Sequence, residues 1–245
     1  MKFTKMEGLG NDFVVVEAED VSPDAVRAWC DRRRGIGADG VLAIDADPAM
    51  RYWNADGSQA EMCGNGLRCV ARYAVDHGWA PAGEWFPVAT AVGPRRVKVD
   101  GDVIVAEIGR VVTGGMLSIE GIDFHRASIG NPHAVALVDD PGEIDVAGLG
   151  ERVNRDPAFP EGANVEFAAL DGANGLRLRV WERGVGETLA CGSGIVVVAA
   201  VLGGHPDGPI RVTVPGGEAR VHFEDGSGYL TGPAETVFTG EWSDP

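Results

Sequence analysis

The sequence predicts an α/β protein built from two copies of one module, because three short patterns each occur twice. A cysteine followed by a glycine-rich segment, a Gly-Asn pair and a Gly-Ala-Asp/Asn triplet return after 128, 120 and 125 residues, respectively. Offsets that drift in this way are expected for a duplicated module with small loop insertions. The repeated pairs are Cys63 and Cys191, Gly10-Asn11 and Gly130-Asn131, and Gly37-Ala38-Asp39 and Gly162-Ala163-Asn164.

Each copy is expected to form one domain that carries one of the two cysteines. A chain of 245 residues is long enough for two domains of ordinary size. The predicted first domain comprises residues 1–114, and the second comprises residues 115–231, with Gly114-Gly115 at the crossing. A last strand within 232–245 is expected to return to the first domain.

Alternating and β-branched residues predict the strands of the first copy, and capping residues predict its helices. Ser22 is a suitable N-cap with Pro23 at the first helical position, which predicts a helix to about Arg33. A second helix follows Cys63. Its apolar residues Leu67, Val70, Ala71, Ala74 and Val75 have helical spacing. The expected strands are 2–7, 13–17, 41–44, 50–54, 84–89, 95–99 and 103–108.

The second copy is predicted to repeat this order of elements. A helix is expected near 145–153. The run Ile195–Leu202 has the β-branched content of a strand, but its place after Cys191 predicts a helix that is buried on every side. The expected strands are 124–129, 133–138, 163–169, 176–182, 210–214, 218–223 and 228–231. The last strand, 235–241, is expected to return to the first domain.

Composition narrows the class of protein. With 44% hydrophobic and 24% charged residues, the chain has the makeup of a soluble globular protein. A net charge of −16 with three lysines argues against nucleic-acid binding, and we interpret Arg32-Arg33-Arg34 as a solvated helix end. The longest apolar run has eight residues, too few to cross a membrane. Without the apolar segment of a secretory signal, the chain is expected to be cytoplasmic.

Neither a metal nor a cofactor is expected. The four cysteines have no C-x-x-C spacing, and Cys30 and Cys69 lie among apolar helix positions typical of the core. Gly35–Gly40 matches G-x-G-x-x-G but lacks the preceding strand and following helix of a dinucleotide site. No phosphate-binding lysine motif is present, and no lysine lies in a segment typical of pyridoxal phosphate binding.

Cys63 and Cys191 are the candidate catalytic residues. Glycines after each cysteine leave the first N–H groups of a helix free to bind an anion, and the helix dipole favours a thiolate. One sulfur on either face of a carbon could invert it, because a thiolate removes the proton and a thiol returns one. Gly64-Asn65 and Gly192-Ser193 would then bind the carboxylate of the substrate.

Plainer interpretations stay open for the same residues. The two cysteines could form a disulfide or be ordinary buried thiols, although cytosolic disulfides are rare. Asparagines next to glycine are most often turn formers. Glu182 and Arg183 could be a surface pair, and His133 could be a structural histidine.

Several longer motifs resemble the diaminopimelate epimerase family, in the family's order and over nearly the whole chain. They are Gly8–Phe13, Asn54–Ser58, Met62–Gly66, Gly130–His133, Gly162–Asn164, Trp181–Gly184 and Ala190–Gly194. The resemblance implies two α/β domains, each a curled mixed sheet around a central helix, in a homodimer. It also implies cofactor-free interconversion of LL- and meso-diaminopimelate for lysine and peptidoglycan precursor synthesis.

The resemblance further implies roles for individual residues. Cys63 and Cys191 are similar to the family's base and acid. Two differences from the family stand out, since Gly40 occupies a position where many members have Gln and Ser193 one where Thr is common. The implied substrate-binding residues are Asn11, Asn54, Gly64, Asn65, Asn131, His133, Asn164, Glu182, Arg183, Gly192 and Ser193.

Three other hypotheses remain. A proline racemase or hydroxyproline epimerase has a similar layout but usually has His at the position of Asn65. A two-lobed amino-acid binding protein would bind diaminopimelate without exchanging its α-hydrogen. A redox sensor would form a reversible disulfide between Cys63 and Cys191 and need no substrate.

Overall fold

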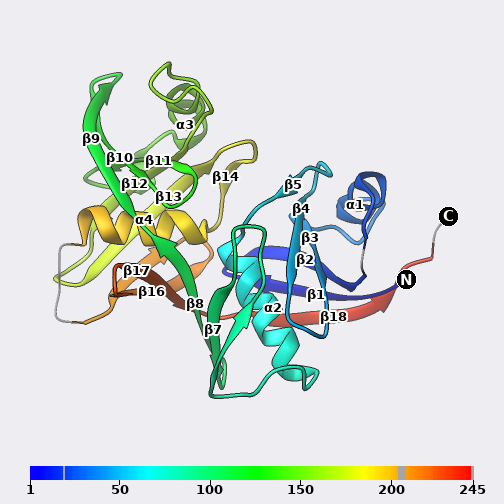
Figure 1. The fold of residues 1–245 in the computed structure, drawn as a ribbon. Coiled ribbons are helices and arrows are strands. Elements are labelled where there is room, and N and C mark those ends of the chain that lie inside the picture. The colour runs from blue at the N-terminus through cyan, green and yellow to red at the C-terminus, as the bar shows by residue number, and fades with distance from the viewer. Residues whose placement is uncertain (19, 204–207, 244–245) are drawn as a thin grey trace. The chain divides into compact units, whose positions relative to one another are not determined.

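The computed structural model describes residues 1–18, 20–203 and 208–243, and the chain divides into two compact units (Figure 1). Unit 1 comprises Met1–Ala106 and Gly232–Pro245, and unit 2 comprises Glu107–Thr231. The division falls inside β8 (Val103–Arg110), whereas Gly114-Gly115, the expected crossing, lies within β9 (Val112–Ile119). The assignment of one catalytic repeat to each domain stays a prediction.

Unit 1 contains a six-stranded sheet in the order β18-β1-β2-β3-β4-β5. β2 and β3 are parallel, and the other neighbours are antiparallel. The C-terminal segment pairs with β1, as expected for 235–241. The strands are β1 (Lys2–Gly8), β2 (Asn11–Glu17), β3 (Gly40–Ile44), β4 (Met50–Asn54), β5 (Gln59–Ala60) and β18 (Glu235–Glu241).

Helix α1 (Pro23–Cys30) begins as predicted and ends early. The Ser22 side chain accepts the N–H of Ala25 at 3.2 Å. The helix ends three residues before the expected Arg33, because the Asp31 carboxylate accepts the backbone N–H groups of Arg33 and Arg34 and turns the chain. Its apolar face packs in a core cluster with β2 and β3.

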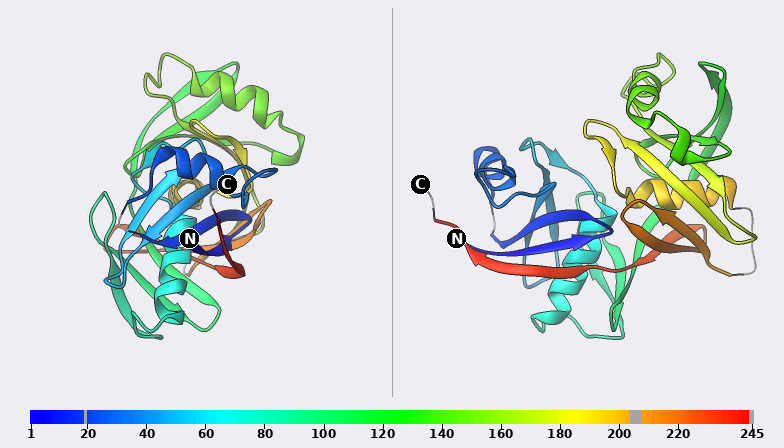
Figure 2. Two further views of the ribbon diagram at one scale, coloured as in Figure 1. Left: turned by 90° about the vertical axis from the view of Figure 1, so that its right-hand side faces the viewer. Right: turned by 180° about the vertical axis from the view of Figure 1, so that it is seen from behind.

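Helix α2 (Gly64–Asp76) is the central helix of unit 1, with Cys63 at its N-cap. It packs against β1, β3 and β4 of the sheet and against β6 (Trp85–Val88) and β7 (Arg95–Asp100) (Figure 2). The predicted apolar face is confirmed by four buried residues, and Val75 is half-buried. The buried residues of that face are Leu67, Val70, Ala71 and Ala74.

Unit 2 has the strand order β17-β16-β15-β13-β12-β11-β10-β9, with β14 beside β13. The pairs β11–β12 and β13–β15 are parallel. The predicted strands are present, but β9 and β14 were not anticipated. The remaining strands are β10 (Ile122–Ser128), β11 (Pro132–Leu137), β12 (Asn164–Leu170), β13 (Gly175–Glu182), β14 (Gly186–Thr188), β15 (Ile210–Val214), β16 (Gly217–Glu224) and β17 (Ser227–Gly232).

Helix α4 (Gly192–Leu202) confirms the predicted helix in the apolar run after Cys191. Its residues Ile195–Ala199 are fully buried, because strands β10–β13, β15 and β16 pack around it. α3 (Val146–Asn154) covers β12 and β13, after a short 3₁₀ turn at Pro141–Glu143. Within the described residues, no helix combines the length and apolar character that crossing a membrane requires.

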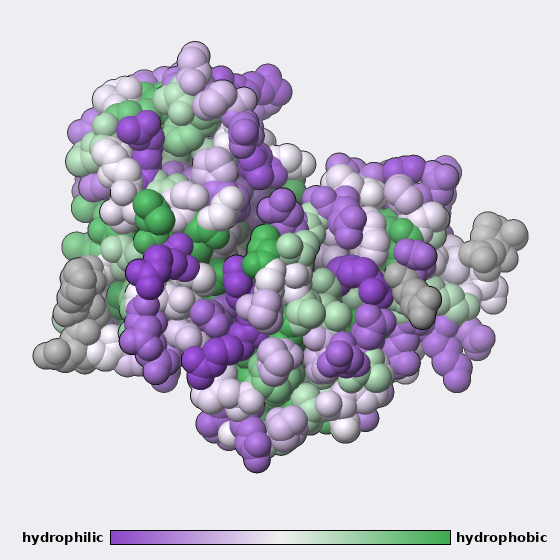
Figure 3. All heavy atoms as spheres, in the orientation of Figure 1, coloured by the Kyte–Doolittle hydropathy of each residue, from purple (hydrophilic) through white to green (hydrophobic). Residues whose placement is uncertain are grey.

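Hydrophilic side chains cover much of the face shown in Figure 3, in keeping with the net charge of −16. Cys30 and Cys69 are 4% and 0% exposed, which confirms that both are core residues. All four cysteines are free thiols. The two remaining cysteines lie at the starts of the central helices.

Candidate active site in two halves

The two candidate catalytic cysteines have the same local construction. Each is the N-cap of its unit's central helix in extended backbone conformation. The sulfur of Cys63 accepts the N–H of Gly66 at 3.4 Å, and the sulfur of Cys191 accepts the N–H of Gly194 at 3.5 Å. An N–H donor and a helix N-terminus both favour negative charge on sulfur.

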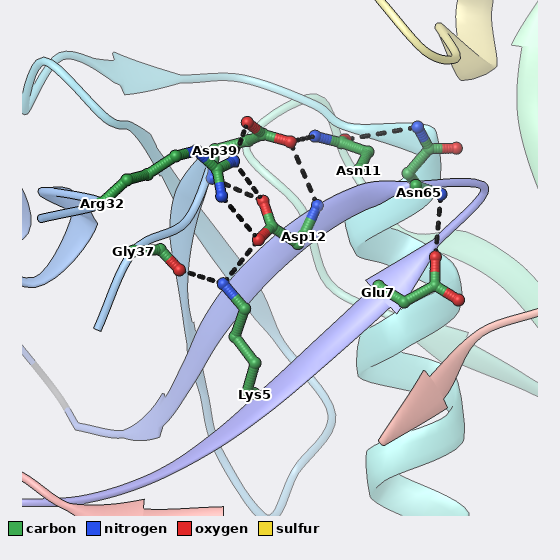
Figure 4. A network of polar contacts seen from close by, with 9 residues as sticks. Lys5, Glu7, Asn11, Asp12, Arg32, Gly37, Asp39 and Asn65 are labelled. Atoms are coloured by element: carbon green, nitrogen blue, oxygen red, sulfur yellow. Dashed lines mark hydrogen bonds and ion pairs between the residues drawn. The ribbon is translucent and has the colours of Figure 1, made fainter. Parts of the chain in front are cut away.

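In unit 1, Asn11 at the start of β2 contacts both Cys63 and Asn65, and Figure 4 shows its bonds to Asn65 and Asp39. Its Oδ1 lies 3.8 Å from the Cys63 sulfur and accepts from Asn65 Nδ2 at 3.3 Å. Asn11 Nδ2 donates to Asp39 Oδ2 at 2.8 Å. An ionised carboxylate can only accept, so this bond fixes which end of the Asn11 amide faces the cysteine.

A charged network holds Asp39 in place (Figure 4). Arg32 binds Asp12 at 2.7 Å and Asp39 at 2.6 Å, and the 6% exposed Lys5 binds Asp12 at 2.6 Å. Burial would raise the pKa of Asp12, but hydrogen bonds from Arg32 and Lys5 outweigh it and hold the pKa well below its ordinary value. Arg32 is therefore part of this network, and its side chain, 57% exposed just after the end of α1, is also solvated as predicted.

Asn54 ends β4 and holds the following turn. Its Nδ2 donates to Ser58 Oγ at 3.1 Å, and its backbone N–H donates to Ser58 O at 2.9 Å. These bonds are those of a turn former, the plainer alternative for this residue. They leave Oδ1 of the amide available for a ligand.

In unit 2, His133 on β11 and Glu166 on β12 form a buried pair. Nδ1 lies 2.6 Å from Glu166 Oε1, and both side chains are 0% exposed. Because the carboxylate accepts, Nδ1 carries the proton. Nε2 lies 3.1 Å from Asn131 Oδ1 and 3.4 Å from Asn164 Nδ2. His133 thus organises both predicted asparagines of this unit.

The carboxylates of Glu182 and Glu166 act electrostatically on Cys191. Burial raises the pKa of the Cys191 thiol, and the charges of Glu182 and Glu166 raise it further. Ser193 Oγ lies 3.3 Å from the sulfur. Burial also raises the pKa of Glu182, whereas hydrogen bonds from Thr188, at 2.6 Å, and Cys191 lower it. Cys191 is consequently held as a thiol.

Arg183 follows Glu182 and anchors Asn164. Its backbone N–H donates to Asn164 Oδ1 at 2.9 Å, which fixes the orientation of that amide. The exposed side chain donates to Glu161 O at 3.2 Å. The guanidinium therefore lies at the surface of its unit, where it can reach an anionic group.

At Gly40, neighbouring groups fill the space that a side chain would need. An added Cβ would lie 2.5 Å from Trp53 O and 2.5 Å from the Tyr52 ring. The ring of Tyr52 therefore takes up room beside this backbone position in β3. The family's glutamine has no counterpart here.

Sequence reasoning missed three buried or networked charged residues. Asp39 was noted only as part of the Gly-Ala-Asp repeat. Arg68 and Glu166 each interrupt an otherwise apolar buried segment, and that interruption was the available signal. Among the described residues, no group of three or more His, Cys, Asp or Glu side chains could hold a metal ion.

Each unit thus assembles its own group of candidate site residues. Asn11, Cys63 and Asn65 meet in unit 1. In unit 2, Asn131 and Asn164 both lie beside Nε2 of His133, and Glu182, Cys191 and Ser193 form a second group. Gly64 and Gly192 are the first residues of their helices, where N–H groups lack helical acceptors.

Solved structures share this fold at low sequence identity. A probable proline racemase from Agrobacterium radiobacter, with bound carbonate, has a TM-score of 0.72 and 15% identity, and the match covers 99% of this chain and 92% of that one. A hydroxyproline epimerase from Agrobacterium vitis has a TM-score of 0.69 and 16% identity, covering 98% and 90%. The chain therefore has the fold of this racemase and this epimerase, with one cysteine at the start of each central helix.

The sequence comparisons specify the family. The diaminopimelate epimerase model matches residues 3–114 and 126–237, which confirms the duplication. The diaminopimelate epimerase of Alkalilimnicola ehrlichii is 42% identical over 98% of both chains, and that of Carboxydothermus hydrogenoformans is 40% identical over 99% of both. The chain belongs to the diaminopimelate epimerase family.

Proposed function

We propose that this protein interconverts LL- and meso-2,6-diaminopimelate in the synthesis of lysine and peptidoglycan precursors. Membership of the family carries this proposal, because curated relatives 36–42% identical over nearly their full length are diaminopimelate epimerases. The presence of a cysteine N-cap in each half supports it chemically. The enzyme is an isomerase, and its reaction requires only proton transfer.

In the proposed reaction, Cys63 and Cys191 act on the same α-carbon. A thiolate takes the α-proton from one face, the electron pair moves into the carboxylate as an enediolate, and a thiol gives a proton to the other face. The base ends as a thiol and the acid as a thiolate, so the reverse reaction exchanges their roles. Bound water is unnecessary for either step.

Helix N-termini are suited to stabilise the enediolate. Backbone N–H groups at the start of a helix favour a carboxylate that gains negative charge, and Gly64, Asn65, Gly192 and Ser193 lie at these two helix starts. The raised pKa of Cys191 supports its role as the protonated partner at neutral pH, with Cys63 as the resting base.

The other proposed residues bind the ends of the substrate. Asn11, Asn54, Asn131 and Asn164 offer amides, and the exposed guanidinium of Arg183 suits a carboxylate. His133 positions two of these amides, and Glu182 suits an ammonium group. Hydrogen bonds within each unit orient the amides of Asn11 and Asn164 before substrate binds.

Exchange in heavy water tests the proposal. LL-diaminopimelate incubated with the protein in D₂O is expected to yield the meso isomer with deuterium at the inverted α-carbon, detected by chiral chromatography and mass spectrometry. Proline and 4-hydroxyproline serve as comparison substrates. Inversion of proline but not of diaminopimelate would favour a proline racemase. Binding of diaminopimelate without exchange of its α-hydrogen would favour a binding protein. Either outcome would contradict the proposed epimerase.

We also propose a homodimer that works in the cytoplasm. β18 is an edge strand whose residues Glu235–Thr239 are exposed, including Val237 at 55% and Phe238 at 47%. An exposed apolar edge strand is a suitable surface for pairing with a second copy. Four free thiols fit a reducing compartment. Light scattering of the purified protein measures the dimer directly.

A further inference from the structure

Arg68 is a buried cation that none of the proposed steps uses. It lies on α2, five residues after Cys63, and is 0% exposed. Its guanidinium donates to three groups. These are Asn65 Oδ1 at 2.9 Å, Gly64 O at 3.3 Å and Pro233 O at 3.1 Å. Two of these three acceptors belong to the first turn of the helix that Cys63 caps.

Two glycines leave room for this guanidinium. A Cβ added at Gly8 would lie 3.2 Å from Nη2 of Arg68, and one at Gly232 would lie 3.4 Å from Nε. These glycines end β1 and β17, so strand ends that are far apart in the sequence enclose the same side chain. The absence of side chains at these two glycines therefore provides the space that the guanidinium occupies.

No carboxylate of the described residues forms an ion pair with Arg68, which is unusual for a buried charge. Its hydrogen-bond acceptors are neutral amides. Burial lowers the pKa of Arg68, and the negative charges that oppose this lowering are those of Cys69, Cys63 and Glu7. Burial keeps Cys69 a thiol by raising its pKa. Cys63 and Glu7 remain as the groups whose negative charge can compensate the guanidinium.

We propose that Arg68 is a positioning residue that favours the Cys63 thiolate and fixes the amides around it. This inference rests on the proposed function, because it assigns the resting base of the same reaction. The guanidinium supplies a permanent positive charge behind the first turn of α2. Its field adds to that of the helix N-terminus, which acts on the same sulfur.

The second part of this role is a chain of hydrogen bonds with fixed polarity. Arg68 can only donate, so it holds Oδ1 of Asn65 and turns Asn65 Nδ2 toward Asn11. Asp39 can only accept when ionised, so it holds Asn11 Nδ2 and turns Oδ1 to where it accepts from Asn65 Nδ2 and, when Cys63 is protonated, from its thiol. A cation at one end and an anion at the other thus determine how both amides face the cysteine.

The second half of the molecule lacks this cation. The residue five positions after Cys191 is Val196, which is also 0% exposed. Helix α4 therefore has an aliphatic side chain where α2 has a guanidinium. The same scaffold can bury an apolar residue at this place, so packing alone does not require an arginine.

Alkylation of the free enzyme tests the proposal without substrate. Rates of iodoacetamide modification of Cys63 and Cys191 are measured by peptide mass spectrometry between pH 5 and 10 in the wild type and in Arg68→Gln. We expect Cys63 to ionise at lower pH than Cys191 in the wild type. In Arg68→Gln, the pKa of Cys63 should rise by about one unit, a roughly tenfold loss of thiolate below that pKa.

Arg72→Gln is the matched control, since Arg72 lies one turn further along α2 and pairs with Asp76 at the surface. It should leave the Cys63 profile unchanged. Arg68→Lys keeps the charge but loses the planar donor group, so it should keep the Cys63 pKa near the wild-type value while kcat falls. Glu7 on β1 also acts electrostatically on Arg68, and Glu7→Gln should shift the Cys63 profile to lower pH because it removes a negative charge.

Three results would overturn the proposal. In the first, Cys63 of the wild type has a pKa equal to or higher than that of Cys191. In the second, the alkylation profile of Cys63 in Arg68→Gln equals that of the wild type. In the third, the Cys63 pKa in Arg68→Lys rises as much as is expected for Arg68→Gln. The first and last of these comparisons remain decisive if Arg68→Gln does not fold. Alkylation requires no diaminopimelate, so it tests the effect of Arg68 independently of epimerisation. If Cys63 has the lower pKa but the wild type does not epimerise diaminopimelate, the proposed function is refuted and the effect of Arg68 on Cys63 stands.

Discussion

The two halves of the molecule share a scaffold but bury opposite charges beside their cysteines. Arg68 lies behind the first turn of α2, where α4 has Val196. Glu166 packs against the first turn of α4, and the position that corresponds to it by the 125-residue repeat is the fully buried Val41. Each charge thus replaces a valine of the other copy, with a cation in the Cys63 half and an anion in the Cys191 half.

In the proposed reaction, this difference assigns the role of base to one cysteine and the role of acid to the other. A cation favours the thiolate that a base needs, and a carboxylate favours the thiol that an acid needs. The helix N-terminus alone gives both cysteines the same tendency to ionise. The repeated scaffold thus carries different charges in its two halves, with Arg68 near Cys63 and both Glu182 and Glu166 near Cys191.

The largest expected effect comes from removing either sulfur. Cys63→Ala and Cys191→Ala should each lower epimerisation by a factor of roughly 10²–10⁴, because each removes one of the two proton-transfer groups. Exchange of the α-hydrogen with D₂O separates them. Cys191→Ala keeps the resting base and should exchange one isomer without inversion, whereas Cys63→Ala should exchange neither isomer near pH 7. Equal exchange by both variants would contradict the assigned asymmetry.

A smaller effect is expected from Glu166→Ala, which leaves the His133 imidazole buried without its partner. Loss of one member of a buried pair should lower the free energy of unfolding by about 3 kcal/mol, measured by urea denaturation. Glu224→Gln, at the exposed end of β16, is the control and should change it by less than about 0.5 kcal/mol. Glu166→Ala should also speed alkylation of Cys191 at a given pH, because one of the charges that raise its pKa is gone. An unchanged alkylation profile of Cys191 would show that Glu166 does not raise the pKa of this thiol.

The smallest effect concerns Gly40, whose counterpart by the 125-residue repeat is the buried Val165. Gly40→Ala places a Cβ against Trp53 O and the Tyr52 ring, so the free energy of unfolding should fall by about 1–2 kcal/mol. Gly115→Ala is the matched strand control, since its Cβ would meet only the end of the Arg126 side chain at 3.8 Å. Equal stability of the two variants would show that β3 can adjust to a side chain here.

The repeated patterns sufficed to predict the two modules, most strands and both central helices. Local rules explain this success, since capping residues and apolar spacing act within a few residues of the chain. The same rules placed Cys63 and Cys191 at helix starts. They overlooked β9 and β14, because a Gly-Gly pair and a Gly-rich segment resemble breaks in structure rather than strand residues.

The amino-acid sequence alone determined the duplicated scaffold and the position of each catalytic candidate cysteine at the start of a helix, because helix starts depend on short-range hydrogen bonds. Tertiary structure decided the charges that act on those sulfurs. Arg68 is enclosed by the ends of β1 and β17, and Glu166 meets His133 across two parallel strands. Such environments come from segments distant in the chain, and burial then strengthens each charge by excluding the water that would screen it.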